Sequence, residues 1–170
     1  VRPANGGASS TEMIAYEADG EVIIKGSEVV GDNWEVANKG IWQLDLKLVE
    51  FGNYNPFLLE NLPNESFDIM KWAHPLRGKL PYTLARGMVF QEGQRLRKLE
   101  SLQKVGKHPG SHWTDIKAGI LYVHTYGKTD PNKVAMELTA RRGCVRPAKR
   151  GLGFIHIKGF TCEHVGNGFP

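Results

Sequence analysis

The sequence has little of what stabilises small secreted domains or anchors a membrane protein. Only two cysteines, Cys144 and Cys162, occur in 170 residues. Two are too few for a disulfide framework, so we expect free thiols. No apolar run approaches the ~18 residues of a membrane helix, and no charged-then-apolar leader opens the chain. We therefore expect a soluble protein, inside a cell or a virion rather than secreted, with peripheral membrane contact left open.

The composition is that of an ordinary globular protein, with 41% hydrophobic and 24% charged residues. Since a domain typically takes about 100–200 residues, the length predicts one domain. Residues 1–11 are small and polar, which predicts a mobile N-terminal arm, and residues 166–170 are glycine-rich, which predicts a flexible tail. The single β-rich domain is expected over residues 12–165.

Alternating apolar and polar side chains predict β-strands. The clearest case is residues 41–51, where Trp42, Leu44, Leu46 and Leu48 alternate with polar residues. Residues 13–18 and 21–25 are predicted to form a hairpin around Asp19-Gly20. Residues 118–126 and 134–139 are predicted to form another, and residues 152–160 a last strand.

One helix is predicted over residues 92–105. Leucine or valine recurs there at every third position from Leu96 to Val105, and Gly106 follows as a stop. The predicted fold class is therefore mainly β with a minor α component. We expect a single-domain antiparallel β-sandwich or barrel with one principal helix near residues 92–105.

The charge is distributed unevenly, although the net charge is only +4. The first 70 residues hold four basic and twelve acidic side chains, whereas the remaining 100 hold eighteen basic and six acidic ones. Such asymmetry creates separate surface potentials. The basic side chains expected to contact an anionic partner are Arg95, Arg97, Lys98, Arg141, Arg142, Arg146, Lys149 and Arg150.

This charge layout predicts a non-catalytic binding protein. Guanidinium groups in the flexible segment 141–153 suit phosphate contacts, so the expected partner is nucleic acid, RNA before DNA, or another polyanion. The acidic half of one copy could meet the basic half of the next, which predicts a homo-oligomer resembling a viral coat or matrix protein at the level of composition. A pure protein–protein assembly module is an alternative.

A magnesium-dependent nuclease is the enzymatic alternative. Many nucleases place an acidic residue before an acidic-x-Lys triplet, and here Asp32 precedes Asp45-Leu46-Lys47. Asp45 and Lys47 would share the polar face of the predicted strand. An ion pair between them is an equally good interpretation. No resident cofactor or metal is otherwise expected, because Cys144, His156, Cys162 and His164 lack the paired spacing of a zinc site.

Overall fold

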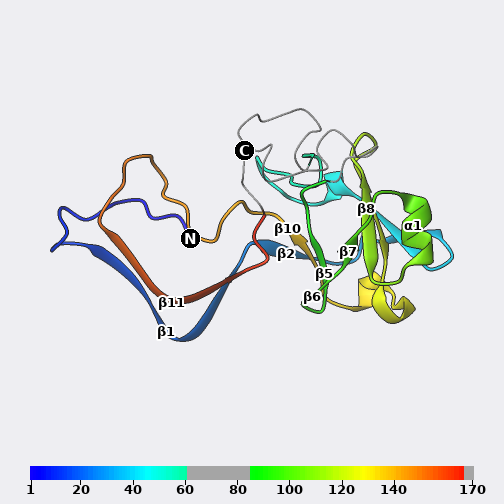
Figure 1. The fold of residues 1–170 in the computed structure, drawn as a ribbon, viewed down its shortest axis with the longest axis horizontal. Coiled ribbons are helices and arrows are strands. Elements are labelled where there is room, and N and C mark those ends of the chain that lie inside the picture. Colours follow the sequence, from blue (N-terminus) through cyan, green and yellow to red (C-terminus); the bar gives the residue numbers. More distant parts are fainter. Residues whose placement is uncertain (61–84, 167–170) are drawn as a thin grey trace, which may run out of the picture. The chain divides into compact units, whose positions relative to one another are not determined.

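The computed structural model describes residues 1–60 and 85–166 (Figure 1). The chain divides into two compact units: Val1–Ser27 together with Arg141–Pro170 form the first, and Glu28–Ala140 form the second, inserted between the halves of the first. In the described part of the chain, no helix is long and apolar enough to span a membrane.

The first unit is built on two parallel strands, β1 (Ile14–Lys25) and β11 (Ile155–Glu163), which run side by side in Figure 1. Ile14 lies opposite Ile155 and Lys25 opposite Glu163. Half-buried and exposed residues alternate at both ends of β1, as expected for a strand with one covered face. The segment predicted to be a mobile arm is hydrogen-bonded to residues 144–154 through the backbones of residues 1, 3 and 7.

The hairpin predicted between residues 13–18 and 21–25 is wrong, because both segments belong to β1. Gly20 has a φ of +80°, which a hairpin turn could require, but here it lies in a bulge within the strand. The register passes from Glu17 opposite Lys158 to Val22 opposite Phe160, so additional residues of β1 bulge out. Residues on both sides of the bulge pair with β11, so the chain does not fold back on itself here.

The described residues of the second unit form two sheets. One has the strand order β2-β10-β5-β6 and the other β3-β4-β9-β8-β7. The pairs within the second sheet are antiparallel except β7 with β8, which are parallel. The strands are β2 (Ser27–Val30), β3 (Glu35–Asn38), β4 (Ile41–Asp45), β5 (Val89–Gln91), β6 (Gln94–Arg95), β7 (Arg97–Lys98), β8 (Ser111–Asp115), β9 (Ile120–His124) and β10 (Met136–Thr139).

An apolar core fills the space between the two sheets. One sheet supplies residues of β2, β5 and β10, and the other supplies residues of β4 and β9. Burial of each large side chain contributes roughly 1.5–3 kcal/mol. This packing confirms the prediction of a mainly β sandwich. The members include Val30, Leu44, Val89, Leu121, Val123, Met136 and Leu138.

The principal helix predicted near residues 92–105 is confirmed, but its bounds are wrong: α1 spans Leu102–Lys107. Residues 94–98 form β6 and β7 instead. Glu92 and Gly93 have φ values of +49° and +79°, which form a two-residue turn that reverses the chain from β5 into β6. The helix begins after Ser101, whose side chain accepts a hydrogen bond from the Lys104 N–H.

The predicted hairpin between residues 118–126 and 134–139 is also wrong. Its first strand, β9, pairs with β4 and β8, whereas its second strand, β10, belongs to the other sheet and pairs with β5. Two short 3-10 helices, η3 (Tyr126–Lys128) and η4 (Pro131–Lys133), lie between them. The segment between β9 and β10 therefore connects the two sheets and is not a tight hairpin turn.

His112 on β8 is a buried titratable group, with only 1% of its surface exposed. Burial, and secondarily the positive charges of Lys98 and Arg95, lower the pKa of its imidazole to about 3. The folded protein therefore holds this side chain neutral at pH values where an unfolded chain, with a pKa near 6.5, would protonate it.

Acidification should therefore destabilise the fold through His112. Below about pH 6.5 the unfolded chain binds a proton that the folded chain excludes, so the free energy of unfolding should fall by up to about 1.4 kcal/mol per pH unit toward pH 3. Urea unfolding across this range should show a shallower pH dependence for His112→Gln than for wild type. His108→Gln is the matched control, because His108 is exposed.

An equal pH dependence in wild type and His112→Gln would contradict this assignment. Should the variant not fold, NMR titration of the wild-type imidazole provides a second test. Its ring carbons should keep the chemical shifts of the neutral form at pH 5, and protonation near pH 6.5 would contradict the prediction.

Candidate functional site

The Asp-x-Lys triplet of the nuclease alternative forms a local cap. Strand β4 ends at Asp45, and residues Leu46–Leu48 form the 3-10 helix η1, so the strand predicted over residues 41–51 is shorter than expected. Asp45 Oδ1 accepts a hydrogen bond from the Lys47 N–H at 2.9 Å. Lys47 therefore does not share a strand face with Asp45.

The sequence contains a second Asp-x-Lys triplet, Asp115-Ile116-Lys117, which also forms a local cap at the end of a strand. Asp115 Oδ1, at the end of β8, accepts from the Lys117 N–H at 3.1 Å and from the Ala118 N–H at 3.0 Å. Aspartate commonly bonds backbone N–H groups two residues on, where a strand enters a turn. The spacing shared by both triplets thus has a structural explanation that needs no metal.

Asp32, the other carboxylate of the nuclease alternative, is exposed between β2 and β3 with a φ of +63°. Within residues 1–60 and 85–166, no group of three or more His, Cys, Asp or Glu side chains is arranged to hold a metal ion. The described side chains without such an arrangement include Cys144, His156, Cys162 and His164 as well as the aspartates.

The predicted anion-contacting residues fall in different units. Arg95, Arg97 and Lys98 lie in the inserted unit, on β6 and β7. The other five lie in the first unit, on the irregular segment 141–150, and all five are exposed: Arg141, Arg142, Arg146, Lys149 and Arg150.

Lys98 differs from the other predicted contacts because it is partly buried. Its ammonium donates a hydrogen bond to the Ala85 carbonyl oxygen. Burial, and secondarily the neighbouring Arg95 charge, lower the pKa of Lys98 to about 8. Its interaction with the chain's own backbone makes Lys98 the least available cation of the group.

The two cysteines lie close together in the first unit, and both are free. Cys144 is buried, and its thiol contacts the Ile24 carbonyl oxygen at 2.9 Å. Ile24 lies opposite Cys162 in the β1–β11 register, and Cys162 is exposed. Burial, together with the neighbouring Cys162 thiol, raises the pKa of the Cys144 thiol.

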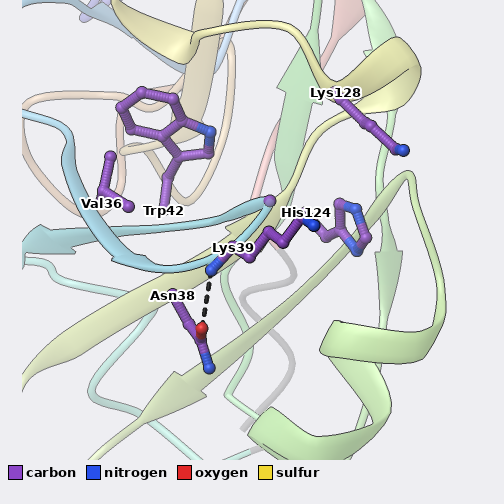
Figure 2. Close-up of a pocket in the computed structure, with 7 residues that line it drawn as sticks. Val36, Asn38, Lys39, Trp42, His124 and Lys128 are labelled. Atoms are coloured by element: carbon purple, nitrogen blue, oxygen red, sulfur yellow. Dashed lines mark hydrogen bonds between the residues drawn. The ribbon is translucent and has the colours of Figure 1, made fainter.

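A cavity of about 420 Å³ opens beside the β3–β4 hairpin in the inserted unit. In the view of Figure 2, Trp42 and Val36 lie at one end of the cavity, and Lys39, His124 and Lys128 lie toward the other. Val36 and Trp42 are cross-strand partners on β3 and β4, so they project on the same face. The cavity combines an indole surface with amide, imidazole and ammonium groups. Its lining residues are Val36, Asn38, Lys39, Gly40, Trp42, His124 and Lys128.

His124 and Gly40 shape this cavity at the hairpin turn. His124 Nδ1 lies 3.0 Å from the Val105 carbonyl oxygen, so Nδ1 carries the proton and donates it. The other ring nitrogen, Nε2, is buried without a hydrogen-bond partner among the described residues. Gly40 has a φ of +76°, and a Cβ there would lie 3.3 Å from Nε2. The glycine therefore lets the turn pass close over the imidazole.

Lys128 occupies the left-handed region, with a φ of +58°, directly after Gly127 at +64°. A non-glycine residue rarely adopts this conformation, which costs about 1 kcal/mol and persists only where surrounding contacts impose it. Lys39 and Lys128 are both exposed, and neither forms an ion pair with a carboxylate among the described residues.

Sequence reasoning missed the cavity. Its residues come from two segments that lie far apart in the chain: the β3–β4 hairpin with its turn, and β9 with η3. The only local signal was Asn38-Lys39-Gly40, which is typical of a turn and carries no functional meaning alone. The pairing of β4 with β9 brings the rest together.

Comparisons with known proteins point to the fold. No protein-family model matches the chain, and no curated protein matches it either. A solved structure described as the complex structure of XylC with xylose is similar over 97% of this chain, with a TM-score of 0.70 and 22% sequence identity. The chain corresponds to 28% of the length of that structure. At this identity the likeness shows a shared fold.

The two thiols should differ strongly in reactivity. Because the thiolate is the nucleophile, the buried Cys144 with its raised pKa should alkylate slowly, while the exposed Cys162 should be modified in the folded protein. Iodoacetamide labelling followed by peptide mass spectrometry should show one modified cysteine under native conditions and two in urea. Faster labelling of Cys144 than of Cys162 would contradict the assignment, and Cys162→Ser provides the control in which native labelling disappears.

Proposed function

We propose that this chain is a saccharide-binding β-module and that the cavity beside the β3–β4 hairpin holds a sugar ring. The observation that carries the proposal is the composition of the cavity: one half-buried indole, Trp42, lines a space that is also lined by amide, imidazole and ammonium groups. The likeness to XylC, solved with xylose, over nearly the whole chain supports the same class of ligand.

The chemistry of a sugar ring matches such a cavity. A pyranose presents apolar C–H groups on its faces and hydroxyls around its rim, so it is held by an aromatic surface together with a few placed polar groups. Trp42 supplies the surface, and Asn38 and Lys39 supply polar groups from the adjoining turn. The volume of about 420 Å³ lies in the range typical of small-molecule sites.

Truncation of the indole should weaken saccharide binding. Trp42→Ala should lower the affinity for xylose and xylo-oligosaccharides at least about tenfold, a loss of about 1.4 kcal/mol or more. Calorimetry, or ligand-observed NMR where binding is weak, measures this. Trp113→Ala is the matched control, since Trp113 is a half-buried indole on β8 that stacks on Tyr122 outside the cavity.

A second variant is needed because Trp42 also packs on the core, and Trp42→Ala could lose binding by unfolding. Val36 lines the cavity with 64% of its surface exposed, so Val36→Trp should obstruct the space without disturbing the interior. Unchanged sugar binding in Val36→Trp, or no binding by the wild-type chain, would overturn the proposal.

Polyanion binding by the segment 141–150 is a second candidate, favoured by the exposure of its basic side chains. Among the described residues, no carboxylate forms an ion pair with Arg146, Lys149 or Arg150. Three unpaired cations left in water in this way can neutralise phosphates and release their counterions. RNA is the proposed partner, and self-association of the chain would multiply the contacts.

The combined substitution of Arg146, Lys149 and Arg150 by alanine should weaken RNA binding uniformly across sequences. It should also reduce the slope of log affinity against log salt by about 3, or about 1 for each cation removed. Fluorescence anisotropy with a labelled single strand at several salt concentrations measures both effects. The matched control replaces Lys47, Lys107 and Lys117, which are exposed in the inserted unit.

Equal slopes in the two triple variants would overturn the polyanion proposal. The same samples test the nuclease alternative. Cleavage of the strand that requires magnesium and disappears in Lys47→Ala would favour an enzyme that uses Asp32, Asp45 and Lys47. An intact strand bound by a larger oligomer would favour assembly on RNA.

A further inference from the structure

The cavity beside the β3–β4 hairpin has an uncompensated positive charge. Of its seven lining residues, Lys39 and Lys128 carry ammonium groups and none carries a carboxyl group. Two ion pairs formed by lysines, Lys104 with Glu100 and Lys133 with Asp130, lie elsewhere, and among the described residues no carboxylate pairs with Lys39 or Lys128. A ligand in this cavity therefore meets two lysines that have no internal counter-ion there.

We propose that the cavity selects an acidic saccharide, a uronate whose carboxylate is held by Lys39 and Lys128 while its ring lies on Trp42. This inference rests on the proposed saccharide site and adds the charge of its ligand. A neutral pentose would satisfy the indole and the polar groups but would leave both ammonium groups facing only water. A uronic acid offers the same ring with one carboxylate added.

Lys39 is held in place by the hairpin turn. Its backbone N–H donates to Asn38 Oδ1 at 2.7 Å, and the following Gly40 adopts a φ of +76°. Both features fix the turn between β3 and β4, so the root of the Lys39 side chain has a defined position. The turn belongs to the same hairpin that presents Trp42, and this couples the position of the charge to the position of the ring surface.

Lys128 is held by a separate set of hydrogen bonds around η3. The Gln91 side chain accepts from the Tyr126 N–H at 2.8 Å and donates to the Tyr126 carbonyl oxygen at 3.3 Å. Thr125 Oγ1 donates to the Thr129 carbonyl oxygen at 2.7 Å, and the Thr129 hydroxyl donates to the Tyr126 carbonyl oxygen at 3.1 Å. These bonds clamp the chain on both sides of Lys128.

These hydrogen bonds explain how the left-handed conformation of Lys128 is maintained. A glycine at this position would adopt the same φ with less steric strain. Strained non-glycine residues cluster at sites where the side chain has a use. The strain at Lys128 and the absence of acidic lining residues are independent observations, and both indicate a cation placed at this cavity.

The expected selectivity is moderate, because both lysines are exposed and solvent screens them. An exposed ion pair adds only a small factor to an affinity. Two such pairs predict that a uronate binds about two- to twentyfold more tightly than the matching neutral sugar. The preference should shrink as salt is added, since exposed charges are screened.

The test compares three sugars with the purified chain by ligand-observed NMR and calorimetry: glucuronate, its neutral methyl ester and xylose. Glucuronate should bind most tightly, and only its affinity should fall with salt. Lys39→Met and Lys128→Met should each lower the affinity for glucuronate about two- to fivefold and leave that for the methyl ester unchanged. Lys117→Met is the matched control, because Lys117 is exposed and does not line the cavity.

Lys128→Gly separates binding from folding. Glycine relieves the strained backbone, so this variant should unfold at the same or higher urea concentration than wild type while losing the preference for glucuronate. Equal binding of all three sugars would overturn the charge selectivity and leave the saccharide site standing. Failure of every sugar to bind would overturn both proposals.

Discussion

The inserted unit depends on the alternation of side chains along one central strand, β9. Leu121 and Val123 point into the apolar core between the two sheets, whereas Tyr122 packs on the opposite face with residues of α1. His124 ends the strand and bonds the Val105 carbonyl oxygen of the same helix. Because successive side chains of a strand face opposite ways, a shift of register by one residue would exchange these environments and bury polar groups in the core. The position of the cavity depends on this strand, because β9 pairs with β4 and places Trp42 opposite Val123.

The spacing of apolar residues and the turn-forming residues could be recognised in the sequence. The strand with which each segment pairs could not. The alternation around Trp42 and Leu44 correctly predicted a strand, which ends early because the Asp45 carboxylate caps the next turn. The recurrence of leucine from Leu96 onward predicted a long helix. The first two buried leucines, Leu96 and Leu99, instead lie between β6 and β7 and directly after β7, and only the later part of the pattern belongs to α1. Glu92-Gly93 was the contrary signal, since that pair suits a tight turn between strands.

The candidate site was harder to predict for a related reason. Clusters of basic residues are visible in a sequence because their members are neighbours, and the exposed segment from Arg141 to Arg150 is one of these. A cavity lined from several strands has no such local signature. Lys39, Trp42 and Lys128 each have an ordinary interpretation alone, as a turn residue, a core aromatic and a loop cation. Only the pairing of β3 with β4 and of β4 with β9 assembles them around one space.

The two candidate surfaces differ in the kind of recognition that they can support. Exposed arginines on an irregular segment contact phosphates one at a time, so their affinity follows the number of charges and carries little information about the ligand's shape. In the cavity, an indole and two lysines are attached to different elements whose positions the backbone hydrogen bonds define. An aromatic surface alone accepts any apolar face, and an exposed lysine alone gains at most about 1 kcal/mol from an anion. We expect discrimination to arise from requiring both, because a ligand must then present an apolar ring face and a carboxylate together.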